Sequence, residues 1–349
     1  MPISSHYSQR MTCKLPSVSD LPALTYPRPN LTDNTLEDND LAQHCPLDNG
    51  RHRLDPKYNL GNLALLPPEI LTAVLTQVDL QSLTEFRRVN QRVMEFIDSI
   101  PQYQAIVTHA PASLRGILSI GTGEWISCQG LYDKLRIAEC ETCGDFGGYL
   151  YIITCRRVCF MCLSEEPAWL PLLRRDAIRK FGLHSKLPAN LPQIRSIPGC
   201  YSPNLKYCPL PLTLIDYESA RDAGIILHGS LRAMEQYASR MVFKSREKYD
   251  TRYSEWTLRK SGPKPRPPRF EDSWDGKSGN PIRFMAIVAA PYLNPTTRCP
   301  EWGFHCVGCR KENAGRLLNW RRKFIMDTFN EHIRQCGDVT DGSHRLAVT

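Results

Sequence analysis

The feature that most constrains this sequence is a doubled cysteine motif near the middle of the chain. Cys140 and Cys143 form one C-x2-C pair, Cys159 and Cys162 form a second, and fifteen residues separate the pairs. Each pair can supply two corners of a tetrahedral site from one local turn, and zinc binds such thiolates at about 2.3 Å. Gly144 suits this turn because glycine adopts positive φ without strain. The spacing predicts a structural zinc site whose four protein ligands leave no position for a catalytic water.

Paired cysteines can also form two disulfides, a redox-active C-x2-C motif or a set of buried free thiols. The sequence starts without the basic and apolar leader of a secreted protein, which predicts a reducing compartment, the cytosol or the nucleus. Clustered cysteines in such a compartment bind metal more often than they form disulfides. No thioredoxin-like βαβ pattern surrounds the motif, and its doubling argues against stray thiols. Zinc is therefore the expected cofactor, with Cys155 as a spare thiol that could replace one ligand.

A second set of metal-binding residue types lies near the end of the chain. Cys306 and Cys309 form another C-x2-C pair, and His332 and Cys336 lie four residues apart on an expected helix. That spacing places both side chains on one face, one turn apart. We expect these four residues to form a second zinc site of Cys3His type. The pattern is less specific than the first because 22 residues separate its halves, and a surface histidine with an unrelated thiol is the alternative. Two rival ligands in this region are Cys299 and His305.

Composition divides the chain into a polar lead-in, a helical segment and a longer mixed region. Residues 1–58 are rich in Ser, Pro, Asn and Asp and are expected to be disordered. Residues 107–336 are expected to form a zinc-stapled α+β region with a flexible Pro-rich loop at 260–281, followed by a tail at 337–349. The whole chain should be mainly α with small β elements. Periodicity predicts strands at 149–153, 282–292 and 302–305, helices at 171–181, 217–258 and 317–335, and a loop at 183–213.

Residues 63–106 are expected to form three short helices. Pro67 and Pro68 suit a helix start, because proline in the first turn gives up an N–H that has no partner there. Ser82 and Glu85 form a capping-box pattern before the second helix, whose apolar face continues to Ile97. Pro101 starts the third helix. So short a unit cannot hide all its apolar side chains within itself, and contact with a partner protein would bury the remainder.

This helical segment resembles the F-box motif. The strings that carry the resemblance are Leu66-Pro67-Pro68-Glu69-Ile70-Leu71, Val78-Asp79-Leu80-Gln81-Ser82-Leu83 and Phe86-Arg87-Arg88-Val89-Asn90-Gln91-Arg92. The resemblance implies that the segment binds the Skp-type adaptor of a cullin–RING ubiquitin ligase. By the same resemblance, the residues that make or support this contact are Leu66, Pro67, Ile70, Leu71, Leu75, Leu80, Leu83, Phe86 and Val89. Asn90 and Val93 depart from the pattern, which often has Cys or Ser and a large aromatic residue at these places.

The cysteine-bearing remainder is similar in pattern to F-box proteins that are abundant in filamentous fungi. The similarity includes both C-x2-C regions and covers about residues 63–336. It implies an F-box substrate receptor of an SCF-type ubiquitin ligase, which binds an unknown target protein through its C-terminal region. Candidate target surfaces are the Pro-rich loop and the exposed side of the helix at 217–258. Such a receptor contains no catalytic residue, because the ligase performs ubiquitin transfer elsewhere.

Other function classes find less support in the sequence. No phosphate-binding glycine loop, G-x-S-x-G, H-E-x-x-H or paired-carboxylate motif is present, so we expect no enzyme. No apolar stretch approaches the roughly 20 residues that cross a membrane. The alternative function is a zinc-containing scaffold that binds nucleic acid or protein outside ubiquitin ligation. Nucleic acid is not the expected partner, because a net charge of +8 is mild for 349 residues. The basic residues that would serve it are Arg316, Arg321, Arg322, Lys323, Arg334, Lys264, Arg266 and Arg269.

Overall fold

The computed structural model of the chain describes residues 21–26, 32–39, 41–45, 47, 55–259, 262–268, 276–310 and 318–344. The predicted fold class is confirmed in its general form: the molecule is mainly helical and contains several small antiparallel sheets. Of the expected Pro-rich loop, only residues 262–268 and 276–281 are described, and Arg269 and Arg316 lie outside the described residues. Within the described ranges, no helix combines the length and apolar character that a membrane crossing would need.

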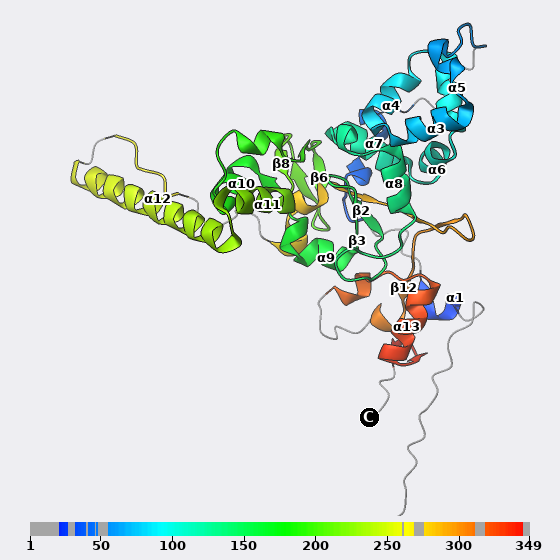
Figure 1. Cartoon of the computed structure of the whole chain (residues 1–349). Helices are drawn as coiled ribbons and strands as arrows, with labels where there is room; N and C mark the ends of the chain where they lie inside the picture. The colour runs from blue at the N-terminus through cyan, green and yellow to red at the C-terminus, as the bar shows by residue number, and fades with distance from the viewer. Residues whose placement is uncertain are drawn as a thin grey trace, which may run out of the picture.

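A compact group of helices contains residues 63–106, the segment expected to form three helices (Figure 1). Leu80 donates its N–H to the Ile126 carbonyl, and Cys128 donates to Val78, so the later helices are tied to the earlier ones. The expected boundary at residue 106 falls inside a helix, and the helical group continues to residue 135. Its elements are η2 (Gly61–Leu65), α3 (Pro68–Gln77), α4 (Leu80–Arg87), α5 (Gln91–Ser99), α6 (Pro101–His109), α7 (Pro111–Ile120), η3 (Gly123–Trp125) and α8 (Cys128–Leu135).

Two side-chain caps change the helices expected between residues 80 and 99. Asp79, not Ser82, caps α4, because its carboxylate accepts the N–H of Ser82 at 2.8 Å. The helix expected to reach Ile97 is broken in two, since Asn90 accepts the N–H of Val93 at 2.9 Å and caps a new helix. Side chains of this kind satisfy N–H groups that have no partner within the helix. The break at Asn90 lets α5 turn against α4 and α6.

A three-stranded antiparallel sheet forms the centre of the molecule. Its strand order is β3-β2-β9, with Leu150 opposite both Arg157 and Val288. Leu150, Ile152 and Val288 are fully buried in one continuous core that also includes the apolar faces of α3 to α8. The helical group and the cysteine-bearing region therefore share a core. The elements here are β2 (Tyr149–Tyr151), β3 (Arg156–Val158), α9 (Phe160–Glu165), η4 (Pro167–Trp169), η6 (Lys277–Gly279), η7 (Pro281–Phe284) and β9 (Ile287–Ala289).

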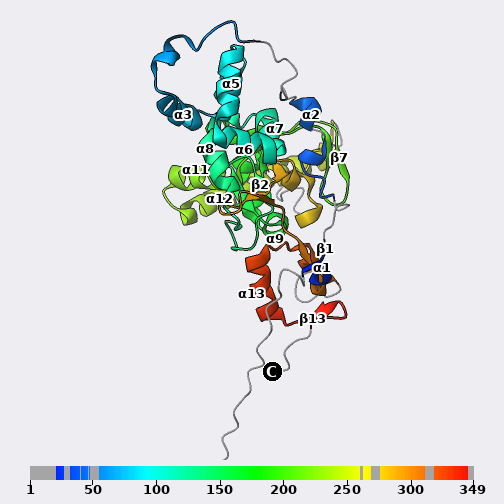
Figure 2. The ribbon, with the colours of Figure 1, turned by 90° about the vertical axis from the view of Figure 1, so that its right-hand side faces the viewer.

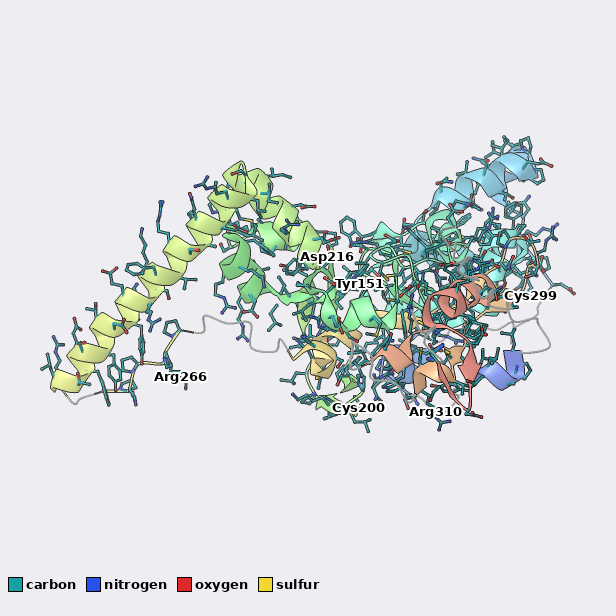
Figure 3. All side chains as sticks on the ribbon, turned by 90° about the horizontal axis from the view of Figure 1, so that it is seen from below. Tyr151, Cys200, Asp216, Arg266, Cys299 and Arg310 are labelled. Atoms are coloured by element: carbon teal, nitrogen blue, oxygen red, sulfur yellow. The ribbon has the colours of Figure 1, made fainter. Side chains whose placement is uncertain are left out.

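A second sheet, of order β4-β8-β5, takes β5 from the region expected to be a loop and β4 from the start of the helix expected at 171–181. The helix α10 packs against this sheet, α11 and α12 pack against α10, and α12 extends away from the body of the molecule (Figure 1). Tyr151 of the central sheet donates to Asp216, the N-cap of α11, at 2.9 Å (Figure 3). The elements are β4 (Leu172–Leu173), α10 (Arg174–Phe181), η5 (Leu187–Asn190), β5 (Gln193–Arg195), β6 (Gly199–Tyr201), β7 (Lys206–Cys208), β8 (Thr213–Ile215), α11 (Tyr217–His228) and α12 (Leu231–Arg259).

The elements from β12 onward gather at the end of the molecule opposite the helical group (Figures 1 and 2). The expected strand at 282–292 is mostly the turn η7 and the short β9, and the expected helix at 317–335 begins only at Met326. Residues before it form a bridge, in which Phe324 and Phe304 exchange backbone hydrogen bonds of 2.9 Å. The elements are β10 (Tyr292–Leu293), β11 (Pro300–Glu301), β12 (His305–Cys306), η8 (Gly308–Arg310), η9 (Asn319–Arg321), α13 (Met326–Cys336), β13 (Val339–Thr340) and β14 (Ser343–His344).

Three parts of the N-terminal segment expected to be disordered are instead packed into the fold. Thr25 and Tyr26 form β1, which pairs with β12. Leu36 is fully buried, and its N–H donates to the Ile287 carbonyl at 3.0 Å. Asn39 holds the N–H and the carbonyl of Cys200 through its side-chain amide. Long-range partners therefore order these residues, although their own sequence is polar. The elements are α1 (Leu21–Leu24), β1 (Thr25–Tyr26), η1 (Glu37–Asn39) and α2 (Leu41–His44).

Candidate metal centres

The four cysteines of the doubled motif come together at one point. One ligand atom from each of Cys140, Cys143, Cys159 and Cys162 lies within 4.8 Å of the others, and three of the four residues are buried. The Sγ atoms of Cys143 and Cys159 are 3.6 Å apart, too far for a disulfide and close to the edge of about 3.8 Å that a tetrahedron with 2.3 Å zinc–sulfur bonds requires. The geometry fits one tetrahedral metal ion.

Local hydrogen bonds shape the two turns that present these thiols. Gly144 has a φ of 79° and donates its N–H to the Cys140 carbonyl at 2.9 Å, which closes the first turn. The second pair follows β3, where Cys159 caps α9 and its Sγ accepts the N–H of Cys162 at 3.4 Å. An N–H directed at sulfur stabilises a thiolate, as a metal ligand requires. The expected role of Gly144 is consistent with this geometry.

Electrostatic coupling within the group favours a bound cation. Hydrogen bonds from the thiols of Cys159 and Cys162 hold the pKa of Cys140 far below its usual value. The same hydrogen bonds raise the pKa of Cys159 and Cys162, with burial adding to the effect. A divalent cation would allow all four thiols to ionise, since a coordinating thiol loses its proton.

A second group of four residues lies in the C-terminal region. Its members are Cys306, Cys309, His332 and His344, all buried, with ligand atoms within 4.8 Å of one another. The two histidine Nε2 atoms are 3.2 Å apart, and each lies 3.4 Å from a cysteine sulfur. Zinc bonds of about 2.1 Å to nitrogen and 2.3 Å to sulfur give tetrahedral edges of about 3.4 to 3.6 Å. This group also fits one tetrahedral metal ion, of Cys2His2 composition.

The fourth member of this group differs from the sequence-based prediction, which named Cys336. His332 directs Nε2 toward the group, whereas Cys336 Sγ lies 3.5 Å from Nδ1, on the other edge of the imidazole ring. Cys336, four residues after His332 on α13, therefore contacts the imidazole ring and is not among the four clustered residues. His344 takes the fourth corner because the hairpin β13–β14 turns the chain back through Asp341 and Gly342, both at positive φ. In the sequence, the Asp341-Gly342 pair could have indicated this hairpin. It lies within residues 337–349, which were expected to form a tail.

A hydrogen bond fixes the orientation of the added histidine. Its Nδ1 lies 2.9 Å from the Gly337 carbonyl, so Nε2 faces the group. Metal-binding histidines commonly hold their second nitrogen in this way. The pKa of Cys306 is lowered to about 2, mainly by a hydrogen bond from Cys309 and further by the two imidazoles. An acidic thiol beside two imidazole nitrogens is a donor set that zinc prefers.

The rival ligands lie outside both groups. Burial raises the pKa of Cys155 to about 12, so this thiol is neutral. Cys299 is exposed at the edge of the molecule (Figure 3). His305 stacks on Tyr26 with ring centroids 5.6 Å apart, and its Nδ1 lies 3.2 Å from the Arg322 carbonyl. Each of these three residues therefore lies at a site separate from both candidate metal groups.

The two candidate centres are connected through the protein. Arg322, which directly follows η9, forms an ion pair with Asp145 in the first cysteine turn. Glu141 in the same turn binds Lys134 at 2.7 Å and Arg156 at 3.1 Å. The buried guanidinium of Arg157 donates to backbone carbonyls at the end of α8 and beyond β9. Each metal group would therefore stabilise contacts made by several elements.

The residues expected to contact an adaptor separate into two sets in the helical group. Four lie on the surface and form the exposed set: Leu66, Pro67, Ile70 and Val89. Leu71, Leu75, Leu80 and Leu83 are buried in the shared core, and Phe86 is partly buried against it. Val74, which was not in the expected set, is 52% exposed and lies one turn beyond Ile70 on α3.

No protein-family model, curated protein or solved structure matches this chain.

Proposed function

We propose that both groups bind zinc and that the metal has a structural role. Four sulfur ligands, or two sulfur and two imidazole ligands, suit zinc better than the oxygen-preferring magnesium or calcium. Each group supplies four protein ligands, which completes a tetrahedron and leaves no site for substrate or water. The first centre would join the turn that precedes β2 to the start of α9. The second centre would join β12, α13 and β14.

We further propose that the chain is a non-enzymatic F-box receptor that docks onto a Skp-type adaptor through α3 and the residues before it. The observation that carries this proposal is an exposed apolar ridge on a helix whose other side is buried. Ile70 and Val74 lie one turn apart on α3 and are 51% and 52% exposed, and Leu66, just before the helix, is 41% exposed, while Leu71 and Leu75 on the adjoining face are buried. Such a ridge loses contact with water only when another protein covers it.

The sequence and the burial pattern both support α3 and the residues before it as the adaptor-binding surface. The exposed ridge begins at the Leu66-Pro67 pair with which the resemblance to the F-box also begins. Pro67 occupies the N-cap position of α3 with a ψ of 141°, so the chain enters the helix in an extended form, and both Leu66 and Ile70 are exposed. In this role the adaptor would bind the ridge, and another surface would bind the target protein.

The test compares two isoleucines that are both exposed. Ile70→Asp places a charge in the proposed interface and should cost about 2 kcal/mol or more of binding free energy to a purified Skp-type adaptor. The matched control is Ile226→Asp on α11, where isoleucine is 82% exposed, and it should bind as the wild type does. Isothermal titration calorimetry on the zinc-loaded chain measures both affinities.

A third variant separates binding from folding. Leu71 is 2% exposed, so Leu71→Asp should lower the free energy of unfolding by several kcal/mol, whereas Ile70→Asp should change it little. Absence of adaptor binding by the wild type would refute the proposal, as would equal loss of affinity in Ile70→Asp and Ile226→Asp. Recovery of a cullin together with the adaptor would distinguish a ligase receptor from a scaffold that acts outside ubiquitin ligation.

A further inference from the structure

The helix α12 is an arm that leaves the body of the molecule. Its 29 residues span about 43 Å, and only Met234 near its start is buried. Met234 anchors the helix in the small core of α10 and α11, where it packs against Gly224. Figures 1 and 3 show the rest of α12 projecting outward, with Arg266 of the returning segment beside it. Residues 231–259 and 262–268 are called the arm below.

A row of positive charges follows the surface of this arm. Arg240, Lys244, Lys248 and Arg252 are four residues apart in succession, and all four are exposed. Among the residues that the structure describes, none of the four forms an ion pair. Like charges at i and i+4 destabilise a helix by about 0.2 to 0.5 kcal/mol per pair. The row therefore lowers the stability of the arm unless an anion lies along it.

Positive charge is concentrated in this part of the chain. The arm has nine basic and four acidic residues, and α10 at its base has four basic residues and one acidic residue. The excess of positive charge on the arm and the excess on α10 together equal the net charge of the whole chain, +8. The remainder of the sequence is therefore balanced, and an acidic partner would be attracted to this end of the molecule.

A pocket of about 230 Å³ lies where the arm meets α10. A cavity of about 150 Å³ can hold benzene, so this volume accommodates a leucine or phenylalanine side chain. Met241, Ser245, Lys248 and Arg252 lie four, three and four residues apart, which places them on one face of α12. The basic row thus continues the face that lines the pocket. The lining residues that matter here are Ile178, Leu183, Tyr237, Met241, Val242 and Ser245.

We propose that this surface binds an acidic peptide segment of a partner protein. One apolar side chain of the segment occupies the α10–α12 pocket, and the acidic residues that follow it lie along Lys244, Lys248 and Arg252. Burial of the apolar side chain fixes the position of the segment, while the charges increase the association rate and select acidic sequences. This proposal does not depend on the adaptor contact of α3, which lies in a different part of the fold.

The arrangement favours a peptide over nucleic acid. Glu247 and Glu255 lie among the basic residues of the arm and would repel a continuous phosphate backbone. A peptide can place uncharged residues opposite these carboxylates. The pocket is lined mainly by apolar side chains, with Arg179 and Ser245 as its polar members, and has room for one aliphatic or aromatic side chain of a peptide.

The experiment measures binding of a fluorescein-labelled peptide, a single leucine followed by glutamates, to the zinc-loaded full chain by fluorescence anisotropy. Lys248→Glu with Arg252→Glu should weaken binding about tenfold, since two attractive charge pairs become repulsive. The matched control is Lys57→Glu with Arg195→Glu, which changes the net charge equally at two other exposed positions and should leave the affinity within twofold.

Two tryptophan substitutions test the pocket. Ser245→Trp fills it and should weaken binding of the leucine peptide, whereas Ser254→Trp, at an exposed position outside the pocket, should not. A peptide with serine in place of leucine should bind more weakly to the wild type and should not distinguish the two tryptophan variants. Circular dichroism checks that each variant keeps its helix content.

Three results would overturn the proposal. They are absence of saturable peptide binding by the wild type, equal weakening by the basic-row variant and its control, and tighter binding of a single-stranded DNA probe that the same substitutions weaken. The last result would assign the arm to nucleic acid. Ile70→Asp should keep full peptide affinity, so failure of the adaptor proposal and failure of this one give different results.

Discussion

The two nitrogens of His332 lie near different sulfur atoms. Its Nε2 lies 3.4 Å from Cys309 and its Nδ1 lies 3.5 Å from Cys336, so only one of these cysteines can share a metal with the nitrogen that faces the group. The structure brings His344 to the remaining corner. At the residue scale, ring orientation therefore decides which candidate is a ligand, and helical spacing alone does not.

Metal content should distinguish the two candidates directly. The wild-type chain should retain two zinc atoms after dialysis against a weak chelator, and His344→Ala should retain about one because a complete tetrahedron is lost. Cys336→Ala, the matched control at the other edge of the His332 ring, should still retain two. Inductively coupled plasma mass spectrometry gives the ratio. Loss of zinc from Cys336→Ala with retention in His344→Ala would restore the original ligand set.

At the scale of single elements, short polar side chains determine where helices begin. Asp79 and Asn90 each accept a backbone N–H three residues ahead, and so they divide an apolar stretch into α4 and α5. The apolar periodicity alone extends across this break, because Val93 and Ile97 continue the spacing of Leu83 and Phe86. Periodicity identifies the buried face, whereas the caps identify the boundaries.

Removal of the Asn90 cap should destabilise the helical group. Asn90→Ala leaves the N–H of Val93 without its acceptor and should lower the free energy of unfolding by about 1 kcal/mol. Asn90→Ser keeps an acceptor at the same place and should restore most of this loss. Urea unfolding followed by circular dichroism measures both variants. Equal stability of Asn90→Ala and the wild type would show that the cap does not contribute.

At the scale of the whole molecule, distant parts of the chain complete one another. The N-terminal β1 pairs with the strand that contains Cys306, and Thr25 lies opposite this cysteine. Leu36 is bound to the central sheet through Ile287. The second metal group therefore supports β1 through β12, whereas the segment around Leu36 depends on the shared core.

Loss of the second metal should release the two N-terminal segments to different degrees. In His344→Ala, chymotrypsin should cleave after Tyr26 much faster than in the wild type, because β12 no longer offers a fixed partner to β1. Hydrogen exchange at Leu36 should stay slow, since its N–H bonds to the buried sheet. Cys336→Ala is the control, and in this variant cleavage after Tyr26 should be as slow as in the wild type. Equal protection of Tyr26 in all three proteins would show that the metal does not order β1.

The sequence by itself determined the features that depend on near neighbours. The doubled C-x2-C motif with its zinc-like spacing, the further pair Cys306 and Cys309, and His332 on its helix follow from separations of a few positions, because local turns and helices have fixed geometry. Only the tertiary structure decided what depends on the path of the chain. It brought His344 back to the second group through a hairpin, ordered the polar segments around Tyr26 and Leu36, and placed strands between Leu183 and Thr213. These features form because residues far apart in the sequence supply each other's hydrogen bonds and apolar contacts, and composition of a single segment does not report such partners.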